Sequence, residues 1–197
     1  MPKVAIKNKN IHEIVNKWIE NPNLEIFTNE TFSPYYGKIE DWDVSNVKNM
    51  NKLFSYQSEF NDDISKWDVS NVEDMNEMFR GAIMFNRMIG NWNVSNVKNM
   101  SGMFRDARSF DQDINKWNIK TVNNMNNMFH GSNFNHDIGR WDVSNVKSMN
   151  SMFRDNQEFN QPIQNWMKQG TGTKNVEDMS YMFFFSKSFN QDITNWD

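Results

Sequence analysis

Few side chains in this sequence could do chemistry, and their spacings match no catalytic or metal-binding motif. The chain has three histidines, His12, His130 and His136, and no cysteine, which excludes a thiolate zinc site and a cysteine nucleophile. His130, His136 and Asp137 could suggest a metal site, but their spacing is that of no known ligand set. No nucleophile, base and orienting group recur together. We therefore predict no catalytic residue, no metal site, no cofactor and no enzymatic activity.

Two other patterns are similar to ligand-binding motifs without matching them. The glycine-rich segment 170–174 lacks the G-x-x-x-x-G-K-[ST] spacing with which backbone amides hold phosphates, so we interpret it as an insertion loop. Acidic residues recur after tryptophan and near isoleucine, but they lack the glycine-rich pattern of an EF-hand or RTX calcium site. We interpret them as turn caps. These residues are Asp43, Asp63, Asp68, Asp113, Asp137, Asp142 and Asp192.

Composition excludes several classes of partner. The chain has 197 residues, a net charge of −4 and 14% aromatic residues, and this length suits one domain or a short repeat array. A pI near 5.4 gives no electrostatic match to a phosphate backbone, so we predict no nucleic-acid partner. No run of about 20 apolar residues occurs, so we expect no membrane insertion. The first nine residues contain no apolar signal-peptide core. As written, the chain is expected to start intracellular, and its final compartment stays unknown.

A repeat of about 25 residues dominates the sequence. Each unit reads W-D-V-S-N-V-x-x-M-x-x-M-F, then about five variable residues, then F-N-x-x-I-x-x before the next tryptophan. Identical side chains at a fixed period can all be buried only if successive turns stack in register. The pattern therefore predicts a solenoid with one continuous core. The repeating tryptophans are Trp42, Trp67, Trp92, Trp117, Trp141, Trp166 and Trp196.

The residues before the array have a different pattern. Apolar residues from Ile11 to Ile19 follow helical spacing, with Asn10 as the expected N-cap and Asn21-Pro22 as the end. We predict that residues 1–40 form an N-terminal capping helix and a degenerate half-repeat. Residues 41–197 are predicted to form the repeat solenoid, as a single structural unit with the cap.

The repeat strings resemble a known family. The segment 42–50, which reads WDVSNVKNM, the pair Met103-Phe104 and the segment 189–193, which reads FNQDI, are similar to the BspA-type leucine-rich-repeat family. They match the branch whose units read W-D-V-S-N-V-x-x-M…M-F…F-N-Q-D-I-S. The resemblance covers residues from about 35 to 197. It implies a surface protein that mediates adhesion or protein binding, without enzymatic activity.

Together, the repeat and the resemblance predict the fold class. We expect an α/β repeat solenoid, a leucine-rich-repeat-like right-handed coil of about six 25-residue turns with an N-terminal helical cap. The β-branched residues of the Ile-x-x-Trp-x-Val stretch favour a short parallel strand in each turn. The spacing of the Val, Met and Met-Phe positions favours a short helical turn on the other side.

Candidate binding residues lie where the turns differ from one another. The second copy has Ile83, Met84 and Met88 at positions that are polar in most other copies, which predicts a contact surface. The position after each Met-Phe pair carries arginine in three copies, which forms either a solvated face or a surface for an anionic partner. The candidate partner-binding residues are Ile83, Met84, Met88, Arg80, Arg105 and Arg154.

The last copy carries a second apolar excess. Tyr181, Phe184 and Phe185 lie outside the core columns, and no cap is visible after Trp196-Asp197. An open end exposes stacked aromatic residues and unpaired edges. We therefore predict that this end is covered by the 183–185 segment, by a second copy or by a partner. The candidate residues for self-association or capping are Tyr181, Phe184, Phe185 and Trp196.

These observations give two functional hypotheses. The first is a non-catalytic protein–protein interaction or adhesion module, which binds an unidentified protein partner through variable positions of the solenoid surface. The alternative is a structural subunit that self-associates, for example as a homodimer, through the uncapped C-terminal end.

Overall fold

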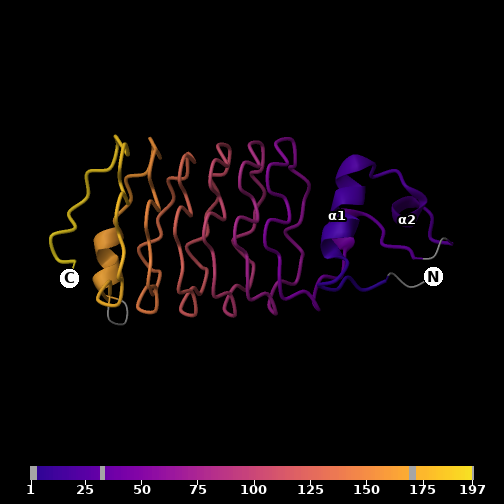
Figure 1. Cartoon of the computed structure of the whole chain (residues 1–197), viewed down its shortest axis with the longest axis horizontal. Helices are drawn as coiled ribbons and strands as arrows, with labels where there is room; N and C mark the ends of the chain where they lie inside the picture. The colour runs from indigo at the N-terminus through magenta and orange to yellow at the C-terminus, as the bar shows by residue number, and fades with distance from the viewer. Residues whose placement is uncertain (1–3, 32–33, 169–171, 197) are drawn as a thin grey trace.

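The computed structural model describes residues 4–31, 34–168 and 172–196. Successive turns of the chain stack side by side along the long axis, with the N-terminal cap at one end and the C-terminus at the other (Figure 1). We number the turns by the tryptophan that ends each one. Turns 1 to 6 are residues 43–67, 68–92, 93–117, 118–141, 142–166 and 167–196.

Regular secondary structure is sparse. The described helices are α1 (Ile11–Glu20), α2 (Glu25–Thr28) and the 3₁₀ helices η1 (Ile39–Asp41) and η2 (Ile163–Lys168). No helix among the described residues is long and apolar enough to cross a membrane. The insertion in turn 6 follows η2, and residues 170 and 171 of the predicted glycine-rich segment 170–174 lie outside the described residues.

The predicted α/β, leucine-rich-repeat-like solenoid with short parallel strands is wrong. The described part of the chain contains no strand, and neighbouring turns are joined by isolated parallel bridges one residue wide, such as Asn49–Asp74 and Asp74–Asn99. The same two positions in every turn, for example Glu77 and Gly81 in turn 2, have left-handed backbone with φ between 51° and 65°. A left-handed residue interrupts an extended strand. The expected helical turns are instead chains of i→i+3 hydrogen-bonded turns.

A regular backbone ladder joins the turns in place of a sheet. Four alternate N–H groups of each turn from 1 to 5 donate to four alternate carbonyls of the next turn. In turn 1 the donors are Met50, Lys52, Phe54 and Tyr56, and the acceptors are Asp74, Asn76, Met78 and Arg80, at 2.9, 2.8, 2.9 and 2.6 Å. The 25-residue period is therefore fixed by backbone hydrogen bonds as well as by side-chain packing.

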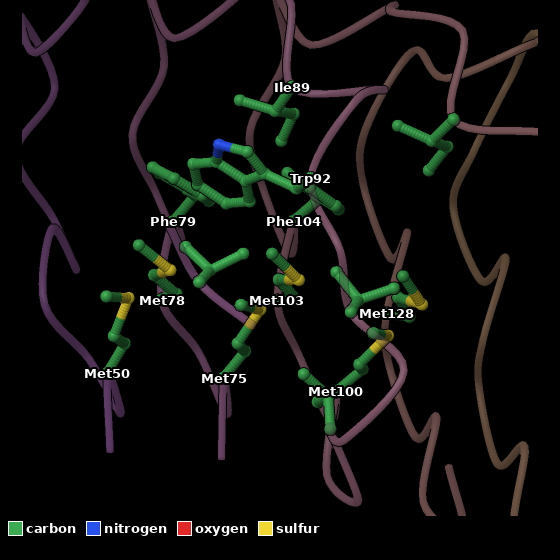
Figure 2. Close-up of a cluster of buried hydrophobic side chains, with 14 of the residues drawn as sticks. Met50, Met75, Met78, Phe79, Ile89, Trp92, Met100, Met103, Phe104 and Met128 are labelled. Carbon is green, nitrogen blue, oxygen red and sulfur yellow. The ribbon is translucent and has the colours of Figure 1, made fainter. Parts of the chain in front are cut away.

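The core is a set of side-chain columns that run through the stack. Phe54 lies 5.6 Å from Phe79, ring centroid to ring centroid, and Phe79 lies 5.7 Å from Phe104, with nearly parallel rings. Methionines of successive turns repeat beside them in register (Figure 2). Trp42, Trp67, Trp92, Trp117, Trp141 and Trp166 are all buried. The prediction that the tryptophans and their companion columns form one stacked core is confirmed for these turns.

The N-terminal cap packs on turn 1 through α1. Ile11, Ile14 and Val15 bury the apolar face of this helix, as the helical spacing predicts. Asn10 is the N-cap residue, as predicted, but its side chain makes no capping hydrogen bond to the helix and accepts instead from the N–H of Lys7 at 2.8 Å. These contacts seat the cap at the N-terminal end of the stack (Figure 1).

Candidate functional site

His136 contacts the preceding turn, and His130 contacts a residue of its own turn. His136 Nε2 lies 3.0 Å from the carbonyl oxygen of Asp111, and His130 Nδ1 lies 3.2 Å from Oδ1 of Asn127. Burial lowers the pKa of His130 below its usual value, and the charge of Arg105 lowers it further. Among the described residues, no group of three or more His, Asp or Glu side chains could hold a metal ion.

The acidic columns cap turns, as predicted. Asp63 Oδ1 accepts the N–H of Ser65 at 2.9 Å, and Asp68 Oδ1 accepts the N–H of Ser70 at 3.0 Å. Hydrogen bonds from these serines lower the pKa of both carboxyl groups. The acidic residues thus stabilise local loop geometry on the surface of the stack.

The arginine column is paired with acidic side chains. Arg80 Nη1 lies 2.8 Å from Oε1 of Glu77, and its guanidinium stacks over the ring of Tyr56 at 5.0 Å. The other two arginines each have an acidic neighbour, with Arg105 Nε 3.5 Å from Asp106 and Arg154 Nε 3.3 Å from Asp155. Each arginine of the column therefore has a carboxylate beside it, and the column presents no continuous basic surface to an anionic partner.

Ile83, Met84 and Met88 form an exposed apolar stretch, here named the second-turn apolar segment. Their side chains are 44%, 48% and 75% exposed, respectively. Phe85, which lies between them in the chain, is fully buried in its column. This turn therefore exposes three apolar side chains to solvent, while Phe85 between them anchors the backbone in the core.

The C-terminal turn is not covered in the way that the sequence suggested. Phe183 continues the core column, 5.7 Å from Phe153, whereas Phe184 and Phe185 point to solvent with 42% and 61% exposure. The 183–185 segment therefore does not fold over the end. Arg154 of turn 5 lies over the rings of Tyr181 and Phe184, at 5.8 and 5.1 Å.

Trp196 completes the tryptophan column without its usual hydrogen bond. Its ring stacks on Trp166 at 5.6 Å. Trp166 Nε1 donates to the Ile138 carbonyl at 2.8 Å, but Trp196 Nε1 has no partner among the described residues. The four predicted C-terminal residues thus lie in one turn, and three of them are exposed at its surface.

Sequence reasoning missed a cleft between the cap and turn 1. This cleft has a volume of about 400 Å³ and is lined by Trp18, Ile19, Pro22 and residues 56–62. Trp18 Nε1 donates to Oδ2 of Asp62 at 2.7 Å, which ties α1 to turn 1. Tyr56 is 64% exposed beside it. The available signal was that Tyr56 occupies a column otherwise filled mainly by glycine and aspartate.

The comparisons with known proteins identify a family but no characterised relative. No curated protein and no solved structure matches the chain. A family model described as "Mycoplasma protein of unknown function, DUF285" matches residues 24–133 and 114–197. The two matches together span residues 24–197, which include all six turns but not α1, and the chain therefore belongs to the DUF285 family.

Proposed function

We propose that this chain is a non-catalytic protein-binding module that contacts an unidentified protein partner through the second-turn apolar segment. The observation that carries the proposal is Met88. In four other turns the equivalent residue is an aspartate whose Oδ1 accepts the N–H two residues later. Those residues are Asp63, Asp113, Asp137 and Asp192. Met88 gives up this hydrogen bond and exposes an apolar side chain, and such departures from local consistency concentrate at functional sites.

The backbone of the second-turn apolar segment is fixed from both sides. The N–H of Met84 donates to the carbonyl of Ser58 at 2.9 Å in turn 1, and the carbonyl of Ile83 accepts from Ser109 at 3.0 Å in turn 3. A partner therefore meets apolar groups on a backbone that needs no further ordering. Binding to a preorganised surface costs less conformational entropy, which supports a contact role for these residues.

The arginine column supports the same proposal because it offers oriented polar groups for a protein contact. Arg80, Arg105 and Arg154 are held by neighbouring carboxylates and rings, so they are oriented without forming a polyanion-binding surface. Arginine and exposed methionine are both enriched in protein interfaces. The resemblance of the repeat strings to the BspA-type branch also supports the proposal, because that branch implies protein binding or adhesion.

The test replaces the second-turn apolar segment with its turn 1 equivalents. The triple variant Ile83→Ser/Met84→Glu/Met88→Asp takes its side chains from Ser58, Glu59 and Asp63, which the same backbone already accommodates. Asn118→Asp is the matched control, because it adds an acidic group at a position where three other turns carry aspartate. We expect affinity capture and cross-linking to recover a protein with the wild type and with Asn118→Asp, but not with the triple variant. Recovery of the same proteins by all three would contradict the proposal.

Self-association through the C-terminal end is the second candidate function. The observation in its favour is that the apolar columns, buried in turns 2 to 5, are only half-buried in turn 6, as at Phe183 and Phe189. Light scattering over a range of concentrations tests this candidate. A concentration-dependent mass that Phe184→Asp/Phe185→Asp abolishes supports it, and a monomer at every concentration rejects it.

A further inference from the structure

The methionines of this chain lie in two kinds of surroundings. The sequence has 15 methionines, and many of them are enclosed in the core columns between neighbouring turns (Figure 2). Met84 and Met88 are the exposed methionines among the described residues. Both lie in turn 2, at positions where no other turn carries methionine. The fully buried methionines are Met50, Met75, Met78, Met100, Met103, Met125, Met128, Met149 and Met152.

A methionine thioether is oxidised only where the oxidant can reach its sulfur. Hydrogen peroxide transfers one oxygen atom to the sulfur, so that an S–O bond forms and the O–O bond breaks. The second oxygen takes up the proton of the first and leaves as water. The sulfur loses two electrons, and the peroxide gains them. An exposed thioether reacts directly, whereas a buried one reacts only when its turn opens.

Two further methionines have intermediate surroundings. The sulfur of Met167 accepts a hydrogen bond from Oγ1 of Thr173 at 3.6 Å. Met179 is partly buried and packs against the core. Both side chains are less exposed than those of Met84 and Met88. The structure therefore ranks the two methionines of turn 2 first in access to a dissolved oxidant.

We propose that Met84 and Met88 are sites of oxidation by peroxide, and that their conversion to methionine sulfoxide makes the second-turn apolar segment polar. The sulfoxide oxygen is a hydrogen-bond acceptor at a place where the thioether offers an apolar contact. Met88 reacts first, because its side chain is 75% exposed and that of Met84 is 48% exposed. Release of the protein partner follows from this change, and this consequence rests on the proposed function of the segment.

The fold keeps the oxidised side chains at the surface. Phe85 and Ile89 directly follow the two methionines in the chain, and both are fully buried. The N–H of Met84 is bonded to the carbonyl of Ser58 in turn 1. These contacts hold the segment in place, and burial of a sulfoxide without a hydrogen-bond donor is unfavourable. Oxidation at these two positions therefore changes the surface and leaves the core columns intact.

The first test treats the whole folded chain with dilute hydrogen peroxide and locates the added oxygen over time by peptide mass spectrometry. We expect Met84 and Met88 to oxidise at least about tenfold faster than Met78, Met103 and Met128. The same mapping in denaturant is the control, because all five should then react at similar rates. Equal rates in the folded chain would overturn the proposal.

The second test measures the change in surface polarity. The matched variant Met84→Leu/Met88→Leu keeps apolar side chains of similar volume but has no exposed thioether in turn 2. After peroxide treatment the wild type should elute earlier from a hydrophobic-interaction column with an unchanged Tm, whereas retention of the leucine variant should not change. Unchanged retention of the wild type overturns the proposal. A lower Tm when only these two methionines are oxidised also overturns it, because their sulfurs would then contribute to the packing of the fold.

Partner capture separates this proposal from the proposed function. The oxidised wild type should lose the protein that the untreated wild type recovers, and the peroxide-treated leucine variant should still recover it. Undiminished capture by the oxidised wild type, where the triple variant loses the partner, overturns the regulatory role. If the triple variant recovers the same proteins as the wild type, the proposed function fails, and the mass spectra and the column still decide the oxidation sites and the change in polarity.

Discussion

The indole Nε1 of Trp92 donates a hydrogen bond to the backbone carbonyl of Ile64, 3.2 Å away in the preceding turn. The same bond joins Trp67 to Ile39 and recurs at every later tryptophan up to Trp166. Each indole thus ties its own turn to the turn before it, in the direction opposite to that of the backbone ladder. Neighbouring turns are held by both sets of bonds, which makes the tryptophan column a connector as well as a core column.

This relationship predicts unequal effects of removing two tryptophans. Trp92→Phe should lower the free energy of unfolding by about 2–4 kcal/mol, because it removes a buried hydrogen bond between turns and opens a cavity, although the Ile64 carbonyl keeps its bond from the N–H of Trp67. Trp196→Phe should lower the free energy of unfolding by much less, because the Nε1 of Trp196 has no partner among the described residues and the side chain is half-buried. Urea denaturation of both variants checks this. Equal losses of stability would contradict the connector role.

Phe185 should be destabilising for the fold. It has left-handed backbone, with φ of 57°, at a surface position where turns 2 and 4 carry Gly81 and Gly131. A non-glycine residue in this region costs roughly 1–2 kcal/mol. We therefore expect Phe185→Gly to leave the free energy of unfolding unchanged or raise it by up to about 1 kcal/mol, after the entropy cost of glycine.

Phe184→Gly is the matched control for that change. Phe184 is the neighbouring exposed aromatic residue, its φ is not positive, and its ring contacts Arg154. The control should lower the free energy of unfolding by about 1 kcal/mol, because glycine adds unfolded-state entropy without relieving strain. If both variants lose stability equally, backbone strain at Phe185 is not significant.

Stability should depend on pH near neutrality through His130. The pKa of His130 is lowered in the folded state, mainly by burial, and that of His12 is lowered by burial as well. Between the lowered pKa and the ordinary value of about 6.5, the unfolded chain binds more protons than the folded chain. The free energy of unfolding should therefore be complete above about pH 6.5 and should decrease as the pH falls through that window.

Variants assign that pH dependence to named side chains. His130→Gln should reduce the slope of unfolding free energy against pH between about pH 5 and 7, and addition of His12→Gln should reduce it further. The carboxyl groups with lowered pKa, such as Asp63 and Asp68, lose their contribution only at lower pH, below their ordinary value of 3.8. An unchanged slope in the double variant would show that other groups cause the dependence.

The Trp18–Asp62 hydrogen bond should control how firmly the cap is attached. Asp62→Ala removes the acceptor and should accelerate amide exchange in α1, while the amides of turns 3 to 5 keep their protection, because each turn contacts only its neighbours. Glu59→Ala is the control, since Glu59 lines the same cleft without bonding to Trp18. Loss of protection throughout the stack would mean that the cap and the turns unfold as one unit.

The candidate surfaces were only partly visible in the sequence. Met88 stands out because four other turns carry aspartate at its position, and its exposure follows from that column. Tyr56 was missed because a single aromatic residue at a variable position gives no periodic signal. The ion pair between Arg80 and Glu77 was also not predictable, because it depends on the backbone conformation of the turn that brings the two side chains together.

The sequence by itself determined which side chains are buried and that the turns stack, because a fixed period of apolar residues has only one way to exclude water from all of them. Only the tertiary structure decided which backbone conformation buries these side chains. Columns such as that of Lys52, Glu77 and Gly102 contain no residue type that demands left-handed backbone, yet all three adopt it. The same burial is compatible with strands or with turns, and the choice depends on hydrogen bonds between residues about 25 positions apart. The direction of those bonds exists only once the turns are stacked.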